Sequence, residues 1–332
     1  MTIDTGKVVT VFGGSGFVGR YLTRALAKRG CRIRVACRRP DLAYHLQPNG
    51  NMGQILPVQA NLRYPWSIER AVQDADHVIN LVGILAKSGK QDFNSLHHEG
   101  TRAVAEAAAK IGAPLTQMSA IGADESSDSV YARTKALGEK AAREVLPETI
   151  IIRPSIIFGA EDQFFNRFAS MSTLSPFLPL IGGGETRFQP VFVADVAEAI
   201  AMTVDGKVAT GTTYELGGRE VMTFREMMDL MLTIIHRRKR FMTIPFKRAA
   251  TMARMMQMVP GAPLTEDQVK QLRHDNVVSE AAKAEGRTFE AFGIQPRLLE
   301  AVLPTYLVRF QPHGQFYRKG PLLNETAEGE PH

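Results

Sequence analysis

The clearest indication of the fold lies near the start of the chain, in residues 8–19. They read Val8-Val9-Thr10-Val11-Phe12-Gly13-Gly14-Ser15-Gly16-Phe17-Val18-Gly19. A β-rich apolar run meets glycines at a spacing of three residues, and an apolar helical pattern follows. A strand, a tight turn and a helix N-terminus in this order attract a pyrophosphate, because the helix dipole and unpaired N–H groups favour anions. We expect Gly13 to permit the turn, Gly16 to admit the phosphates, and Gly19 to allow close helix packing. The alternative is a glycine-rich turn without a ligand.

The composition is ordinary for a soluble globular protein, and 332 residues can bury a large core in one domain or in one domain with a smaller lobe. No apolar run is long enough for a transmembrane helix. The first strand begins so early that we expect no targeting peptide. Cys31 and Cys37 are too few for a disulfide framework or a zinc site. We therefore expect small buried hydrophobic residues there, and no metal site.

The net charge of +6 is unevenly distributed. No carboxylate occurs between Asp229 and Glu266, and nine of the 14 methionines fall between Met222 and Met258. The cations of this segment are Arg237, Arg238, Lys239, Arg240, Lys247, Arg248 and Arg254. A basic, Met-rich region of this kind, about residues 236–258, fits an anionic membrane surface or a protein partner. The alternative is a core-facing helix with a solvated basic face, and the absence of a recognisable module argues against nucleic acid.

Strands and helices alternate through the first half of the chain, a pattern that predicts βαβ units and a parallel sheet. Strands are expected at Val8–Phe12, Arg32–Cys37, Ile55–Ala60, His77–Val82, Leu115–Ser119 and Thr149–Ile152. Helices are expected at Val18–Lys28, Ser67–Gln73, Phe93–Ile111 and Ser129–Val145. The predicted fold class is therefore α/β, a Rossmann-type doubly wound parallel sheet, with a smaller, mainly helical C-terminal lobe.

After Gly159 the alternation loosens. We expect loops at Ser175–Gly184, short strands at Pro190–Val193 and Tyr214–Gly218, and helices at Asp195–Val204, Phe224–Ile235, Phe246–Met258 and from Thr265. The predicted domains are a nucleotide-binding domain at 1–205 and a C-terminal lobe at 206–319, partly interleaved with the first. A flexible tail is expected at 320–332, because it has few large apolar residues.

The type of nucleotide is suggested by the end of the second strand. An acidic residue there would accept the ribose 2′-hydroxyl of NAD, but this chain has Arg38 and Arg39, which suit the 2′-phosphate of NADP(H). Asp41 keeps NAD open, and the arginines could also be merely solvated. Further residues expected to border the cofactor are Gly14, Ser15, Phe17, Asn61, Leu62, Leu81, Val82, Gly83 and Pro154.

A candidate catalytic pair is formed by Tyr131 and Lys135, which lie four residues apart and share one helix face. A nearby ammonium favours the ionised phenol, so we expect Lys135 to lower the pKa of Tyr131. The same lysine could bind the nicotinamide ribose.

The glycine pattern, the Tyr-x-x-x-Lys motif and Arg153-Pro154 together resemble the short-chain dehydrogenase/reductase superfamily, in its extended or atypical branch. The resemblance implies a substrate-polarising serine, for which Ser119 is the local candidate. Where extended members place that serine, this chain has Ala120, Ile121 and Gly122. The departure suggests that Tyr131 and Lys135 only hold the nucleotide.

Three longer stretches resemble a narrower family, the nucleotide-binding accessory subunits of respiratory complex I. They are Tyr131–Glu144 (YARTKALGEKAARE), Ile151–Met171 and Gln189–Ile200. The resemblance implies tightly held NADPH without established turnover, a place beside the membrane and quinone-site subunits, and a role in assembly or stability. We expect a peripheral protein at the cytoplasmic face of a bacterial inner membrane. The alternatives are a working NADPH-dependent reductase or epimerase, and a redox sensor.

Overall fold

The computed structural model describes residues 6–87, 89, 91–257 and 264–312. Its central element is a seven-stranded sheet in the order β11-β6-β5-β4-β1-β2-β3, with every neighbouring pair parallel. The strands are β1 (Val8–Phe12), β2 (Arg32–Cys37), β3 (Ile55–Gln59), β4 (His77–Asn80), β5 (Leu115–Met118), β6 (Ile150–Pro154) and β11 (Thr213–Leu216). This order confirms the predicted Rossmann-type α/β fold.

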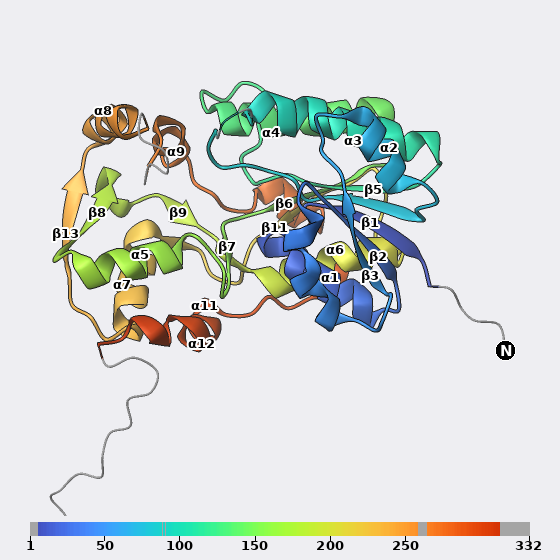
Figure 1. The fold of residues 1–332 in the computed structure, drawn as a ribbon. Helices are drawn as coiled ribbons and strands as arrows, with labels where there is room; N and C mark the ends of the chain where they lie inside the picture. Colours follow the sequence, from blue (N-terminus) through green and yellow to red (C-terminus); the bar gives the residue numbers. More distant parts are fainter. Residues whose placement is uncertain (1–5, 88, 90, 258–263, 313–332) are drawn as a thin grey trace, which may run out of the picture.

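Helices cover both faces of this sheet (Figure 1). On one face α1 (Phe17–Lys28) packs against α6 (Val193–Val204). The other face carries α2 (Pro65–Val72), α3 (Gly100–Lys110) and α4 (Val130–Val145). Because both faces are covered, all five residues of β1 are buried, which explains its nearly unbroken apolar sequence.

A second lobe lies beyond the carboxyl ends of the strands (Figure 1). Its main helices are α5 (Phe165–Leu174), α7 (Phe224–Ile234), α8 (Phe246–Met256) and α9 (Glu266–Gln271). Shorter elements are β7 (Ile157–Phe158), β9 (Arg187–Phe188), β10 (Val191–Phe192), β12 (Met222–Thr223), α10 (Glu280–Ala284), α11 (Leu299–Val302) and α12 (Pro304–Leu307). Within the described residues, no helix combines the length and apolarity needed to cross a bilayer.

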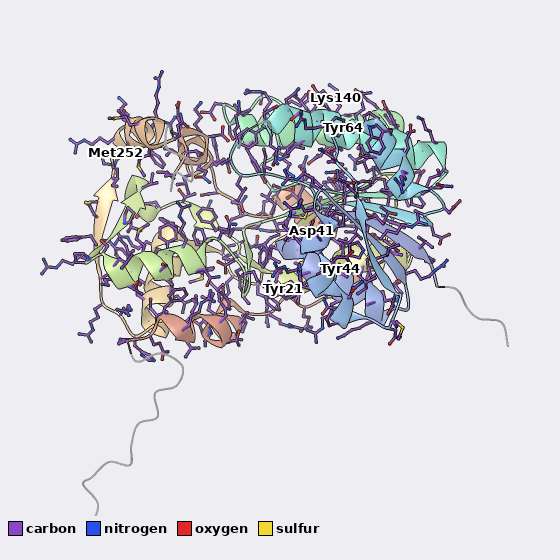
Figure 2. All side chains as sticks on the ribbon, in the orientation of Figure 1. Tyr21, Asp41, Tyr44, Tyr64, Lys140 and Met252 are labelled. Atoms are coloured by element: carbon purple, nitrogen blue, oxygen red, sulfur yellow. The ribbon has the colours of Figure 1, made fainter. Side chains whose placement is uncertain are left out.

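The two parts of the chain interleave. Strand β11 follows residue 205 in the sequence, yet it is part of the large sheet. Helix α5 precedes residue 205, yet it packs with α7 in the second lobe. The boundary at 205 stays a prediction, and the tail at 320–332 lies outside the described residues. Met252 on α8 lies at the end of the second lobe, far from Asp41 beside the sheet (Figure 2).

Two expectations about local structure were wrong. The segment expected as loops contains β8 (Phe177–Ile181), which pairs in parallel with β13 (Arg240–Ile244) from the basic segment. Pro179 and the neighbouring glycines weaken the strand signal in the sequence. The partner strand is also distant in sequence, so no local pattern predicts the pairing. The helix expected over Phe93–Ile111 instead begins with a π-helical segment, η3 (Asn94–Glu99), before α3.

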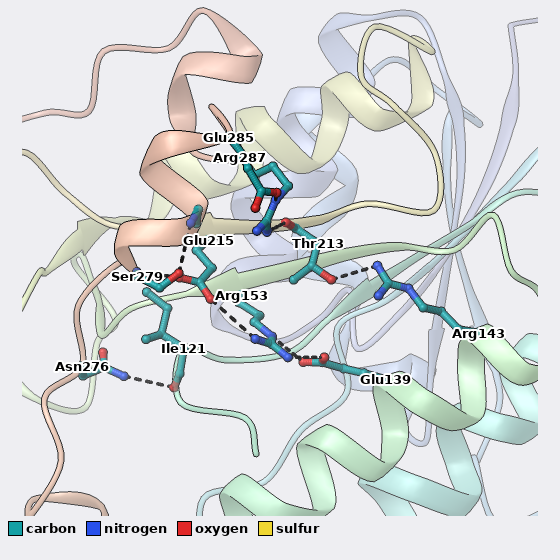
Figure 3. Close-up of polar contacts among 11 residues, drawn as sticks. Ile121, Glu139, Arg143, Arg153, Thr213, Glu215, Asn276, Ser279, Glu285 and Arg287 are labelled. Atoms are coloured by element: carbon teal, nitrogen blue, oxygen red, sulfur yellow. Dashed lines mark hydrogen bonds and ion pairs between the residues drawn. The ribbon is translucent and has the colours of Figure 1, made fainter. Parts of the chain in front are cut away.

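A buried ion network joins the sheet to α4 and to the C-terminal lobe (Figure 3). Arg153 on β6 donates two hydrogen bonds to Glu139 of α4, at 2.9 and 2.6 Å, and lies 3.5 Å from Glu215 of β11. The second oxygen of Glu215 accepts a hydrogen bond from the backbone of Ser279. The side chains of both carboxylates are 9% exposed, and Arg153 is the cation that forms an ion pair with both of them.

Replacing Arg153 with methionine should lower the free energy of unfolding by roughly 3–5 kcal/mol, because two carboxylates would remain buried without their partner. The matched control is Arg187→Met, which removes the ion pair between Arg187 and Asp275. The side chain of Arg187 is 61% exposed. That change should cost less than about 1 kcal/mol. Urea unfolding followed by circular dichroism measures both, and equal losses would contradict the assigned role of the network.

Candidate functional site

A cleft of about 2720 Å³ opens at the carboxyl ends of β1 and β4, where the strand order reverses, and continues into the second lobe. It brings together all the sequence-predicted site residues except Gly14. Those that line it are Gly13, Ser15, Gly16, Phe17, Gly19, Arg38, Arg39, Asn61, Leu62, Leu81, Val82, Gly83, Ser119, Tyr131, Lys135 and Pro154. Gly14 lies beneath the turn, where a Cβ would be 3.1 Å from the side chain of Val35.

The glycine turn has the geometry of a phosphate cradle. Gly13 has φ +77°, which other residues rarely adopt, and a Cβ on Gly19 would lie 2.4 Å from the carbonyl oxygen of Gly14. The first turn of α1 therefore packs against the backbone of the loop. Among the described residues, no side chain caps the N-terminus of α1 and its first turn holds no carboxylate. This terminus is available to an anion, and the site fits a dinucleotide pyrophosphate.

The arginines at the end of β2 both line the cleft, whereas Asp41 does not. Arg39 donates hydrogen bonds to Asp41 at 3.0 and 2.7 Å, and both side chains are exposed. The arginine holds the pKa of Asp41 below its usual value by hydrogen bonding. Asp41, the carboxylate that could have favoured NAD, is thus paired with Arg39 and does not line the cleft.

Lys135 lies with Tyr131 in a packed cluster. Its ammonium donates a hydrogen bond to the carbonyl of Met118 at 3.3 Å and would be 3.0 Å from a Cβ on Gly83. It also lies 5.9 Å from the centre of the Tyr131 ring. The glycine at the end of β4 therefore makes the room that the ammonium occupies.

Burial decides the charges of this pair. It lowers the pKa of Lys135 to about 8, and it raises the pKa of Tyr131 to about 12, with a further contribution from the carboxylate of Asp267. The direction for Tyr131 is opposite to the expectation from the sequence, because desolvation outweighs the attraction of the ammonium. At neutral pH the phenol is neutral and a weak proton donor.

Ser119 has the features of a ligand-binding group. It is 2% exposed, it lines the cleft, and its hydroxyl has no hydrogen-bond partner among the described residues. A buried hydroxyl without a partner costs free energy, so a polar ligand atom here would restore a lost hydrogen bond.

Two residues that the sequence analysis missed hold this cluster. His97 in the π-helical segment packs its ring edge-to-face on Tyr131, with centroids 5.4 Å apart, and accepts a hydrogen bond from the backbone N–H of Ile84. Asp267 of α9 accepts hydrogen bonds from Ser129 and from the backbone of Val130 and Tyr131. The only signal for Asp267 was its place in the turn that follows Thr265.

The buried histidines should make stability depend on pH. Burial, with a smaller effect of Lys135, lowers the pKa of His97 to about 2, and burial lowers that of His77 to about 4. The unfolded chain binds protons below about pH 6.5, while the folded chain does not. Stability is therefore full above that pH and is lost as the pH falls.

We expect His97 alone to account for about 2 kcal/mol of lost stability between about pH 7.5 and pH 5. His97→Gln should remove that share from urea unfolding curves measured across this range, even if the variant is less stable overall. The control His45→Gln changes an exposed histidine and should leave the pH profile as it is. An unchanged profile for His97→Gln would mean that the folded chain protonates His97 as readily as the unfolded chain does.

Comparisons with known proteins first identify a protein family and a fold that this chain matches. Residues 9–217 match the NAD dependent epimerase/dehydratase family. The NADPH-dependent quinone oxidoreductase QOR2 of Escherichia coli, solved with NADPH, superposes with a TM-score of 0.71 at 16% identity, covering 90% of this chain and 99% of that one. At this identity the likeness shows the fold alone.

Relatives at higher identity narrow the class. The mitochondrial NADH dehydrogenase (ubiquinone) 1 alpha subcomplex subunit 9 of Arabidopsis thaliana is 36% identical over 325 residues, covering 93% of this chain and 79% of the relative. A ceramide reductase of Caulobacter vibrioides is 34% identical over 197 residues, covering 59% of this chain and 61% of the relative. The chain belongs to the family of the complex I alpha subcomplex subunit 9, an atypical branch of the short-chain dehydrogenase/reductase superfamily.

Proposed function

We propose that the chain is a nucleotide-binding accessory subunit of a bacterial respiratory complex I, which supports assembly or stability rather than turnover. The likeness to a complex I subunit over 93% of the chain is the observation that carries the proposal. The subunit would contact other complex I subunits near the quinone site, at the cytoplasmic face of the inner membrane.

The nucleotide in this proposal is NADPH, held tightly. The uncapped terminus of α1 would bind the pyrophosphate, and Arg38 and Arg39 would bind the 2′-phosphate. Lys135 would donate hydrogen bonds to the nicotinamide ribose. Bound NADPH would supply a hydride, but the chain has Ala120, Ile121 and Gly122 where extended members of the superfamily carry the acting serine, which favours a structural use. Binding would then stabilise the fold by mass action.

The arginines provide the test of nucleotide identity. Arg38→Asp should weaken NADPH binding roughly tenfold to a hundredfold, with a lower melting temperature, because a charge-assisted hydrogen bond is replaced by repulsion. Binding of NADH should change little. Calorimetric titration of both nucleotides into the emptied protein measures this. Arg70→Asp on α2, exposed and outside the cleft, is the control, and equal loss for NADH and NADPH would exclude recognition of the 2′-phosphate.

A membrane-facing surface is supported by the exposed face of α8 and β13. We define the docking surface by its exposed residues Arg238, Arg240, Met242, Lys247, Arg248, Arg254 and Met255. Within the described part of the chain, none of its cations pairs with a carboxylate. The methionines contribute less than expected, because Met227, Met228 and Met231 are fully buried in the lobe core. Met258 lies outside the described residues.

The docking surface should bind anionic lipid through its cations. The double change Lys247→Gln and Arg248→Gln should weaken binding to vesicles that contain phosphatidylglycerol by about thirtyfold, since each charge near the surface contributes roughly 1 kcal/mol. Vesicle flotation at low salt measures the partition coefficient. Lys28→Gln on α1 serves as the control. Binding that survives the double change would place any membrane contact elsewhere.

A second candidate function is an NADPH-dependent reductase or epimerase. The buried hydroxyl of Ser119 beside Tyr131 and Lys135 favours it, and one relative is named a ceramide reductase. The two functions differ in a complementation experiment. Loss of the chain from its host should lower the amount of assembled complex I, and Tyr131→Phe should restore it fully under the accessory-subunit proposal. Failure of Tyr131→Phe, with nucleotide still bound, would favour the enzyme.

A further inference from the structure

The cleft does not end at the proposed nucleotide site. Its lining also holds two groups of apolar side chains, which we call its walls: Phe164, Phe168 and Met171 in or next to α5, and Met252 and Met256 on α8. The walls belong to different regions of the lobe: the first packs against the cluster around α5 and α7, and α8 supplies buried alanines to a separate cluster. Apolar side chains from two separate clusters therefore border the same cleft.

The exposure of these side chains is unfavourable without a ligand. Met252 lines the cleft and is 47% exposed, and Phe164, Phe168, Met171 and Met256 are only half-buried. Removing apolar surface from water is favourable by roughly 25 cal/mol per Å². A long apolar chain between the walls would thus gain free energy from every methylene that it buries.

The charges along this half of the cleft favour an anion. Arg167 lines it and forms no ion pair among the described residues, while Arg273 stacks on Phe246 with its guanidinium carbon 5.8 Å from the ring centre. Two of the carboxylates on the lining have partners. Asp162 accepts a 2.6 Å hydrogen bond from Tyr306, and Asp275 pairs with Arg187 at 2.7 Å.

We propose that the cleft between α5 and α8 binds a single-chain lipid with an anionic head group, such as an alkyl phosphate or a fatty acid. The apolar chain lies between Phe168 and Met252, and Arg167 binds the head group. Arg248 of the docking surface lies four residues before Met252 on α8, so the proposed lipid site lies beside the proposed membrane contact. The inference rests on the proposed function, because that function supplies the nucleotide at one end of the cleft and the membrane at the other.

The first test uses the full chain, loaded with NADPH, and a series of n-alkyl phosphates from octyl to tetradecyl, each below its critical micelle concentration. Affinity measured by calorimetry should rise by about fourfold per methylene until the cleft is filled. The matching n-alkanols should bind at least tenfold more weakly, because they lack the charge. Affinity that is independent of chain length would overturn the proposal.

Two matched pairs of variants test whether dodecyl phosphate binds in the cleft or elsewhere on the protein. Met252→Asp places a carboxylate on the cleft lining, where it repels the phosphate, and should abolish binding of dodecyl phosphate, whereas Leu174→Asp changes an apolar residue that is 88% exposed and lies outside both the cleft and the docking surface. Arg167→Gln should reduce the preference for phosphate over alkanol, and Lys28→Gln on α1, outside the cleft and the docking surface, should not. Equal effects within either pair would contradict the assigned site.

The nucleotide content of every variant is measured in parallel. If the alkyl series fails while NADPH remains bound, the lipid site is wrong and the accessory-subunit proposal stands. If the chain holds no NADPH but still shows the chain-length dependence, the proposed function is wrong and the lipid site stands. Met252 (Figure 2) lies on α8, which also carries Lys247, Arg248, Arg254 and Met255 of the docking surface, so soluble probes are used instead of vesicles.

Discussion

The contact of Arg153 with two buried carboxylates is the constraint on which this structure depends. It fixes the helix that carries Tyr131 and Lys135 against the sheet, and through Glu215 it fixes the backbone that leads into the last third of the chain. Asp267 acts on the other end of the same helix, where it accepts three hydrogen bonds around its N-terminus. The cleft therefore keeps its shape only while both lobes are in contact.

Burial rather than pairing sets the electrostatics at the centre of the cleft. A lysine beside a tyrosine suggested an activated phenol, but the surrounding aromatic rings and backbone remove both groups from water. The phenol consequently holds its proton, and the lysine loses its own more easily than usual. At neutral pH a phenol with a raised pKa is a weak proton donor.

The sequence predicted what local patterns encode. Gly13 and Gly19 are needed for a turn and a close approach, and the helix expected at Phe224–Ile235 is present as α7, which Thr223 begins with a capping box. It did not predict contacts between distant segments. The pairing of β8 with β13 joins two short runs with weak strand signals, and the role of Asp267 depends on a lobe whose position no local pattern records.

Co-purification tests the central claim most directly. The chain would be tagged in its native host, the membranes solubilised gently, and the particles separated by size. We expect the chain to migrate in a stoichiometric amount with NADH:quinone oxidoreductase activity, in particles of large mass. NADPH should be retained on the chain. A free protein of its own mass, with nucleotide that exchanges rapidly, would contradict it.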